Sequence, residues 1–546
     1  MLALGSNVPQ HACILRSRSH EGEKLAMKAS RVSRWQGTLL SLGLLAVVSA
    51  VGSPLLSGQT SIPVRDGSLA NTAPYLYAAE DFGIDPASVT YHKDIAPILI
   101  DNCVKCHTTR GMAPMALTSY GEVRRWAQRI KERTAIRDRR GAMPPFFVER
   151  NIGIQKFRDS EYLEDNELAL IQAWVDNGTL EGDPADAPKN VMALGEGEAA
   201  SHEDSGAVPW ELGEPDLIIP MQEIDMPRTG PDQWGDYGML PTGVTKDRYV
   251  KAVQVREVSD LSFDDPALAN TVGGRWVFHH MSYAVRALDE DGNVTPERIS
   301  YPIHEVGRNA DIFPEEVGYP LPANSVIHLH NGHMRPNQVR ETTARLEFGF
   351  YLHPEGYEPT YRRRGSLSMG NDVDVYARPG EANQTFETYT VLEDHTKLYA
   401  WEPHLHAPGA RACVEAIWGP VVHTLNCVGY DHNWVKQYLY APGYEPLLPK
   451  GTVVRYIGYL DTTDDNQNVA DNRNWQGSGR RSVANMFLEL GWVVSMTEEQ
   501  FQEEMAERRE MMRDRNDFDI GCPLCWAFEE EYFDSRPVTD DGGGGF

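Results

Sequence analysis

The sequence is short of basic residues. Its 546 residues include 51 lysines and arginines against 79 acidic residues, and the formal net charge is -28. Such a chain is repelled by the phosphates of nucleic acids and by anionic lipid headgroups. The charge therefore argues against nucleic acid as a partner and favours solubility and cationic partners.

Long hydrophobic runs are also scarce. The apolar run from Leu39 to Val51 is short for a membrane span, and basic residues precede it while small residues follow it. This order is typical of an export signal, which we assign to 27–58, with Met27 as the expected start. We therefore predict a periplasmic or otherwise exported protein. Anchoring to a membrane would require that the signal stays uncleaved.

Cysteine is rare, with seven in the chain, and two of them form the most specific motif. Cys103 and Cys106 are two residues apart and His107 follows directly, a spacing that suits covalent haem attachment. No second metal-type cysteine pair lies nearby, which argues against a zinc site. We predict one haem c, bound through thioethers to both cysteines, with His107 as an axial iron ligand.

Apolar residues at helical spacing surround this motif, in 91–99, 121–139 and 165–177, and predict a small α-helical unit. The segment between the last two, Gly-Ala-Met-Pro-Pro-Phe, is stiff and non-helical because of its prolines. It can hold the thioether of Met143 in one place. We predict Met143 as the second axial ligand, with Met112 and Met115 as alternatives.

Residues 89–185 resemble the cytochrome c domains of large multidomain proteins of planctomycete-like bacteria. The resemblance is carried by the haem motif, the Met-Pro-Pro turn and three further stretches: Ile95-Ala96-Pro97-Ile98-Leu99, Met112-Ala113-Pro114-Met115-Ala116-Leu117 and Trp174-Val175-Asp176-Asn177-Gly178. An irregular leader, 59–88, precedes this domain. A linker rich in Ala, Gly, Pro and acidic residues, 186–209, follows it.

After the linker the periodicity changes from helical to alternating. Expected strands are 249–258, 276–285, 325–330, 345–352, 411–418 and 452–460. Many short strands between Gly and Pro turns predict antiparallel β-sandwiches, jelly-roll-like in type. The length suits two in tandem, 210–365 and 366–496, followed by a charged helix and flexible tail, 497–546. The fold class is thus multidomain, α followed by all-β.

Histidines gather in this β region. His404 and His406 are two apart, so on a strand both imidazoles project from one face and can bind one ion. His328 and His330 repeat this arrangement.

The third cluster is an adjacent pair, His279 and His280. Neighbours on a regular strand point to opposite faces, so a shared metal there requires a bulge or a strand end. No matching carboxylate cluster accompanies the three groups. Imidazole and thioether ligands suit copper better than magnesium or calcium.

The β region resembles the type-2 copper, ascorbate-dependent monooxygenases, the family of peptidylglycine α-hydroxylating monooxygenase and dopamine β-monooxygenase. The resemblance spans about 210–496 and is carried by His279-His280-Met281, His328-Leu329-His330, His404-Leu405-His406, Tyr430-Asp431-His432-Asn433-Trp434, Leu448-Pro449-Lys450-Gly451-Thr452 and Ser482-Val483-Ala484-Asn485-Met486.

This resemblance implies two coppers. His279, His280 and His328 would hold an electron-transferring copper in the first domain, with His330 and His333 as rivals of His328. His404, His406 and Met486 would hold the oxygen-binding copper in the second domain.

The cysteines depart from the animal members of that family. Residues 210–365 contain none, so a larger apolar core must stabilise that domain. In the second domain Cys413 and Cys427 flank a turn centred on Pro420, which would place them opposite each other, and we predict a disulfide. Cys522 and Cys525 lack a following His and suit a structural disulfide.

Together these features predict an exported haem and copper oxidoreductase. By resemblance it would be a monooxygenase that hydroxylates a C–H bond of an unknown organic substrate with O₂. The fused haem would supply electrons from an external donor, in place of ascorbate. The alternative is a non-catalytic electron carrier or copper-binding protein with a β scaffold.

Overall fold

The structure is a computed structural model. It describes residues 67, 69, 74–108, 113, 115–158, 160–188, 210–261, 276–305, 310–367, 369–473, 477–479, 483–515 and 522, all within the unit Thr60–Phe546. The predicted export signal, Met112 and Cys525 lie outside the described residues. No helix in the described part of the chain is long and apolar enough to cross a membrane.

Three helices lie where helical spacing predicted them: α1 (Ala96–Asn102), α2 (Tyr120–Thr134) and α3 (Asp165–Asp176). Shorter helical turns occupy Ala79–Phe82, Pro86–Ser88, Tyr91–Ile95 and Pro184–Asp186. The helices share a core of their own, to which α2 contributes Val123 and Ile130, and α3 Trp174. A capping box at the start of α2 and another at the start of α3 satisfy their first backbone donors.

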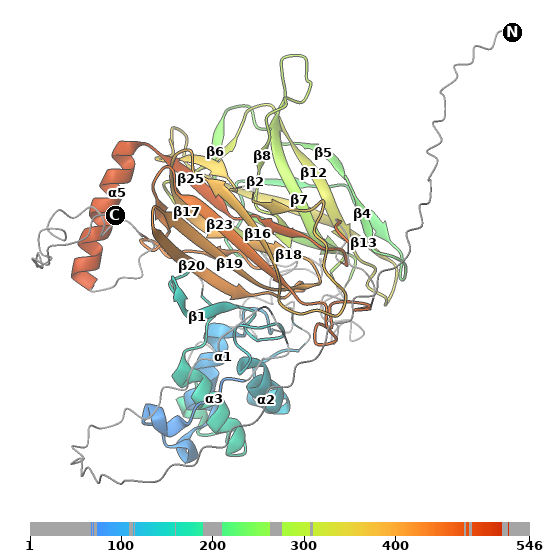
Figure 1. Cartoon of the computed structure of the whole chain (residues 1–546). Helices are drawn as coiled ribbons and strands as arrows, with labels where there is room; N and C mark the ends of the chain where they lie inside the picture. The colour runs from blue at the N-terminus through green and yellow to red at the C-terminus, as the bar shows by residue number, and fades with distance from the viewer. Residues whose placement is uncertain are drawn as a thin grey trace, which may run out of the picture. The chain divides into compact units, whose positions relative to one another are not determined.

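The strands of 217–352 form two antiparallel sheets (Figure 1). One has the order β10-β6-β13-β2, with β11 paired to β6 and β3 to β13. The other has the order β4-β12-β7-β8, with β5 paired to β12 and β9 to β7. Tyr283 of β7 contacts Phe348 of β13 at 4.9 Å between ring centres, so the sheets pack face to face. The bounds are β2 Leu217–Pro220, β3 Ile224–Met226, β4 Gln233–Gly235, β5 Gly238–Pro241, β6 Arg248–Ser259, β7 Phe278–Ala287, β8 Ile299–Ser300, β9 His304–Glu305, β10 Ala310–Ile312, β11 Tyr319–Leu321, β12 Ser325–Met334 and β13 Thr342–Leu352.

The strands of 362–496, together with β1 (Val148–Gly153), form three further antiparallel sheets, of order β1-β20-β19-β23-β16, β14-β25-β17-β21 with β22 on β17, and β15-β24-β18. Tyr456 of β23 stacks on Phe487 of β24, which brings the first and third sheets together. The bounds are β14 Arg362–Gly365, β15 Gly370–Asn371, β16 Gln384–Val391, β17 His395–Trp401, β18 Pro403–Leu405, β19 Gly409–Trp418, β20 Val421–Gly429, β21 Tyr438–Leu439, β22 Leu447–Leu448, β23 Val453–Leu460, β24 Phe487–Glu489 and β25 Trp492–Met496.

One strand comes from an unexpected place. β1 (Val148–Gly153) lies inside the segment assigned to the cytochrome-like domain, yet it pairs with β20 and extends the second domain's sheet (Figure 1). Two glycines allow this approach: a Cβ on Gly153 would lie 2.0 Å from the Leu425 carbonyl oxygen, and one on Gly429 would lie 1.8 Å from that of Asp138. The helical part is therefore joined to the second β domain by strand addition.

Hydrophobic and ionic contacts surround this junction. Phe157 stacks on Tyr440 with ring centres 5.2 Å apart, and both belong to the core of the β region. The Glu149 carboxylate, 1% exposed, lies 2.7 Å from both Arg139 and Arg411. Burial alone would raise the pKa of Glu149, but the two guanidinium groups outweigh it and hold the pKa below its usual range.

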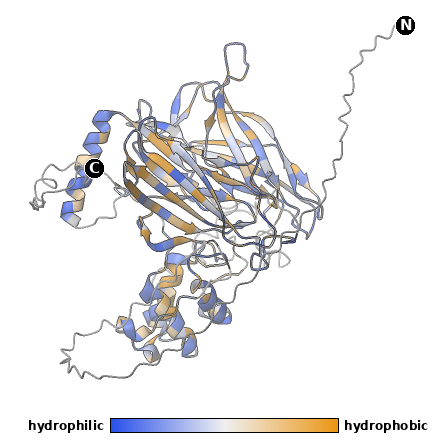
Figure 2. Ribbon diagram, viewed as in Figure 1, coloured by the Kyte–Doolittle hydropathy of each residue, from blue (hydrophilic) through white to orange (hydrophobic). Residues whose placement is uncertain are grey.

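The predicted disulfide between Cys413 and Cys427 is confirmed. The two residues are directly paired in the β19–β20 hairpin, whose turn is Gly419-Pro420. Cys522 is also disulfide-bonded. The predicted charged helix is present as α5 (Glu498–Arg515), which is hydrophilic over most of its length (Figure 2). A capping box between Thr497 and Gln500 opens this helix.

Removing the hairpin disulfide should destabilise the second β domain. The double substitution Cys413→Ala and Cys427→Ala releases a loop closed over 14 residues of sequence. Loop-closure entropy predicts a loss of about 3 kcal/mol in the free energy of unfolding. Urea denaturation of the oxidised wild type and of the double variant measures this loss. Coincident denaturation curves would contradict the prediction and would mean that the unfolded chain gains no freedom when the disulfide is removed.

Candidate metal and haem sites

A cavity of about 740 Å³ adjoins the Cys-x-x-Cys-His motif. Its volume falls in the usual range for ligand sites, about 300–1,000 Å³. The helical part contributes Cys103, Cys106, His107, Met115, Trp126, Ile130, Arg133 and Met143 among others, and the second β domain contributes Asp431, Asn433, Trp434, Asp465 and Gln467. The cavity therefore lies at the junction that β1 creates.

The motif's side chains suit covalent haem attachment. Neither Cys103 nor Cys106 is in a disulfide, and burial raises the pKa of Cys103 to about 12, so that it is a neutral thiol. His107 Nδ1 lies 2.9 Å from the Met115 carbonyl oxygen. Because a carbonyl only accepts, Nδ1 must carry the proton, and Nε2 remains available as an iron ligand.

Met143 and Met115 both line this cavity, but their settings differ. The backbone of Met115 is tied to the ring of His107, which places it on the histidine side. Met143 lies on the segment after α2, where its N–H donates to the Arg133 carbonyl. Three arginines of the lining, Arg129, Arg133 and Arg140, offer cations for the two carboxylates of a haem.

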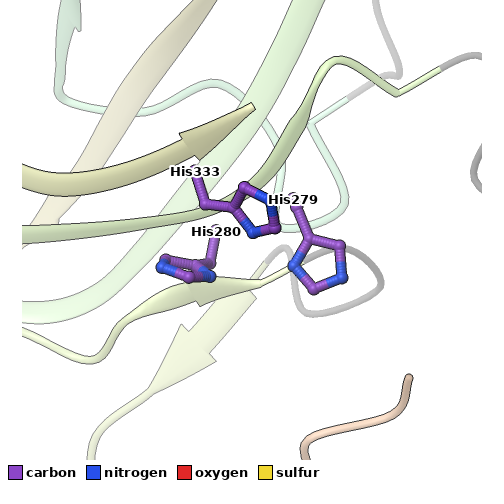
Figure 3. Close-up of side chains that lie close together, drawn as sticks. All are labelled: His279, His280 and His333. Atoms are coloured by element: carbon purple, nitrogen blue, oxygen red, sulfur yellow. The ribbon is translucent and has the colours of Figure 1, made fainter. Parts of the chain in front are cut away.

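The first imidazole cluster contains His279, His280 and His333, with one ring nitrogen of each within 4.8 Å of the others (Figure 3). His279 and His280 come from β7 and His333 from the neighbouring strand β12. Figure 3 shows the three rings side by side. The cluster thus includes His333, which the sequence analysis gave as an alternative to His328.

The expected third ligand, His328, and its first rival, His330, lie elsewhere. His328 Nε2 is 2.6 Å from an Asp236 carboxylate oxygen, and His330 Nε2 is 2.6 Å from an Arg298 guanidinium nitrogen. On the β12–β7 ladder they face Ala284 and Ser282, whereas His333 faces His280. Neither residue belongs to the cluster of His279 and His280.

Two irregularities in the β12–β7 ladder explain this arrangement. His330 pairs with Ser282 and His333 with His280, so β12 advances three residues there while β7 advances two. Met334 then pairs with Phe278, so β12 advances one residue while β7 again advances two. The first bulge brings His333 opposite His280, and the second makes His279 an extra, unpaired residue. The expected need for a bulge at the adjacent pair is therefore confirmed. Asn331, at φ 51°, with Gly332 after it, was the available sequence signal.

The surroundings leave these three rings able to bind a metal ion. His333 Nε2 lies 2.8 Å from an Asp232 carboxylate oxygen, while its buried Nδ1 has no hydrogen-bond partner. Trp234 stacks on the same ring with centres 3.8 Å apart. Burial lowers the pKa of His280 to about 3 and of His333 to about 4, and it lowers that of His279 strongly. All three rings are neutral at pH 7, as metal binding requires.

The second cluster is formed by His404 and His406, whose ring centres are 5.4 Å apart. Burial lowers the pKa of His404 well below its usual value, and its Nδ1 is buried without a hydrogen-bond partner. Met486 directly precedes β24, where Phe487 pairs with Leu405. One further step of this antiparallel register would set Met486 opposite His406, on the face that carries both imidazoles.

A further histidine, His432, lies between the two clusters. Its ring centre is 5.7 Å from that of His406 and 6.4 Å from that of His279. Sequence reasoning did not propose it as a ligand, because no second histidine stands at a chelating spacing from it. Its chain neighbours Asp431 and Asn433 line the cavity at the Cys-x-x-Cys-His motif.

Comparison with known proteins leaves the family open. No protein-family model matches this chain, and no curated protein matches it.

Proposed function

We propose that this protein is an exported oxidoreductase that binds one haem c and two copper ions and hydroxylates a C–H bond of an organic substrate. The reaction R–H + O₂ + 2 electrons + 2 protons gives R–OH and water, so it balances with two electrons from an external one-electron donor. Bound haem and copper would supply one-electron redox chemistry and oxygen activation.

The observation that carries this proposal is the common wall of the two kinds of site. The loop Asp431–Trp434 borders the cavity at Cys103, Cys106 and His107, and the same loop holds His432 against both imidazole clusters. A haem donor and histidine-bound acceptors that border the same four-residue loop suit electron transfer between them.

The chain's own residues have separate tasks in this proposal. Cys103 and Cys106 attach the haem, and the Met115 carbonyl fixes the tautomer of His107. Asp232 orients His333, and Trp234 covers its face. His404, His406 and Met486 would hold the oxygen-binding copper, because imidazole and thioether ligands accommodate both Cu(I) and Cu(II).

Metal content tests this assignment directly. Protein matured in a host that attaches haem c should contain one haem and two coppers per chain. His333→Ala should lose one copper, because it removes a member of the first cluster, whereas His328→Ala should keep both. A pyridine haemochrome assay and elemental analysis measure these ratios. Zinc in both sites, with no copper uptake, would contradict the proposal.

Oxygen consumption distinguishes the enzyme from a carrier. With a reduced donor, the copper-loaded protein should consume O₂ in proportion to hydroxylated product over a panel of organic substrates. Reversible haem reduction without any O₂ uptake would leave the chain as an electron carrier.

Met143 should set the potential of the haem. Met143→Ala should leave the haem attached, because both thioethers remain, but lower its reduction potential by on the order of 0.1 V or more within the roughly 0.8 V range that axial ligands span. Met115→Ala is the matched control, since the Met115 backbone carbonyl that contacts His107 survives it. A redox titration measures both. An unchanged potential in Met143→Ala would move the assignment to another methionine.

A further inference from the structure

His432 has the marks of a ligand rather than of a structural histidine. Both of its ring nitrogens are buried, and neither makes a hydrogen bond of good geometry. Burial lowers its pKa to about 4, although a weak hydrogen bond with the Leu405 backbone acts in the opposite direction. A buried polar group without a hydrogen-bond partner costs about 1–3 kcal/mol. A bound metal ion would remove this cost by accepting the lone pair of a ring nitrogen.

The loop that carries this ring is held in place. Asp431 is buried, and its Oδ1 accepts from the backbone N–H of Asn433 at 3.1 Å while its Oδ2 accepts from that of Gly141 at 3.3 Å. Its backbone carbonyl accepts from the Trp434 N–H at 2.9 Å. These bonds fix the backbone on both sides of His432, so the imidazole is positioned before any ion arrives.

Distance and the composition of the first cluster indicate which group His432 belongs to. The ring centre of His432 is 5.7 Å from that of His406 and 6.4 Å from that of His279, so His432 lies nearer to the second cluster. The first cluster already has three imidazoles, because one ring nitrogen of each of His279, His280 and His333 lies within 4.8 Å of the others. The second cluster has only two, and a third imidazole would complete it.

We propose that His432 is a third imidazole ligand of the metal held by His404 and His406. This inference rests on the proposed function, because it takes that metal to be copper. The second site then has three imidazoles with Met486 as a further donor, and the first site keeps His279, His280 and His333. The stacked pair of His432 and His279 makes the two sites neighbours, and the loop of His432 connects the second site to the wall of the haem cavity.

The test compares His432→Phe with wild type. Phenylalanine keeps an aromatic ring of similar shape and removes both nitrogens. The matched control is His423→Phe, which changes a half-buried histidine of β20 outside the clusters. All three proteins carry His333→Ala as well, so that only the second site binds. Copper affinity is measured by competition with a chelator, and the number of bound imidazole nitrogens by pulsed electron paramagnetic resonance of Cu(II).

We expect three coupled imidazoles in the His432-containing proteins and two in His432→Phe, with affinity reduced by more than about 10-fold, since even indirect partners of a metal ligand contribute 10–100-fold. An unchanged affinity and nitrogen count would overturn the proposal while leaving the function standing. If the wild type takes up no copper, the proposed function is wrong. The role of His432 is then tested separately by cobalt binding, because the ligand-field spectrum of Co(II) reports its ligands. Should His432→Phe misfold, judged by circular dichroism, His432→Ala takes its place in the same comparison.

Discussion

Replacing His404 by alanine should abolish the copper-dependent reoxidation of the haem by O₂. In the proposed arrangement, a six-coordinate haem with His107 and Met143 as ligands would offer oxygen no open position, so its electron would leave through copper held by His404 and His406. His404 is half of the chelating pair, and its loss should slow the reaction by more than about 100-fold, the upper end of what indirect partners of a ligand contribute. Stopped-flow absorbance at the haem bands, after anaerobic reduction and mixing with O₂, measures the rate.

Three companion variants make this result specific. Met486→Ala should suppress the fast phase less completely, because the imidazoles still hold the ion while the thioether that favours Cu(I) is gone. His280→Ala should leave the second copper loaded but unreduced. His423→Ala, outside both clusters, should react as wild type does. Equal rates with and without copper would refute the transfer of electrons from haem to copper.

Glu149→Gln should release the helical part from the second β domain. The carboxylate is 1% exposed and neutralises two arginines, Arg139 at 2% and Arg411 at 9% side-chain exposure. Removing one member of a buried ionic group leaves uncompensated charge and costs about 3–5 kcal/mol. We expect a loss of that size in the free energy of unfolding, measured by urea denaturation, together with new proteolytic cleavage near β1.

The matched control is Glu161→Gln at the same junction. Glu161 pairs with Lys436 at 3.2 Å, but that lysine is 28% exposed, so the expected loss is about 0–1 kcal/mol. Similar losses in both variants would mean that burial of the Glu149 group does not strengthen its contribution.

Lowering the pH should also destabilise the folded wild-type protein. Because the folded pKa of Glu149 lies below the ordinary value of 4.5, its stabilisation is complete above that pH and declines as pH falls through the folded pKa.

Local patterns were sufficient for the parts of this protein whose cause is local. The helices α2 and α3 and the paired cysteines of the β19–β20 hairpin appear where the sequence predicts them. Helical periodicity, strand alternation and turn residues act over a few neighbours, so they can be read from the sequence alone. The Cys-x-x-Cys-His motif is likewise a contiguous signal.

Tertiary structure decided the rest. Alternation places His328 and His330 on one strand face, and the resemblance named His328 as the third ligand, with His330 and His333 as rivals. A bulge at Asn331-Gly332 puts His333, and neither of the other two, opposite His280. One extra residue on one strand moves every later pair in the ladder, and only the partner strand determines whether it is accommodated.

The junction between the helical part and the second β domain could not be predicted from the sequence either. β1 lies far in sequence from β20, and no periodicity within 148–153 indicates which sheet edge it joins. His432 is near neither His279 nor His404 along the chain, and it meets their clusters only because the two β domains pack against each other. The sequence by itself determined which candidate ligand residues the chain carries and their local spacing. Which of them come together depends on strand register and domain packing, which are properties of contacts between distant segments.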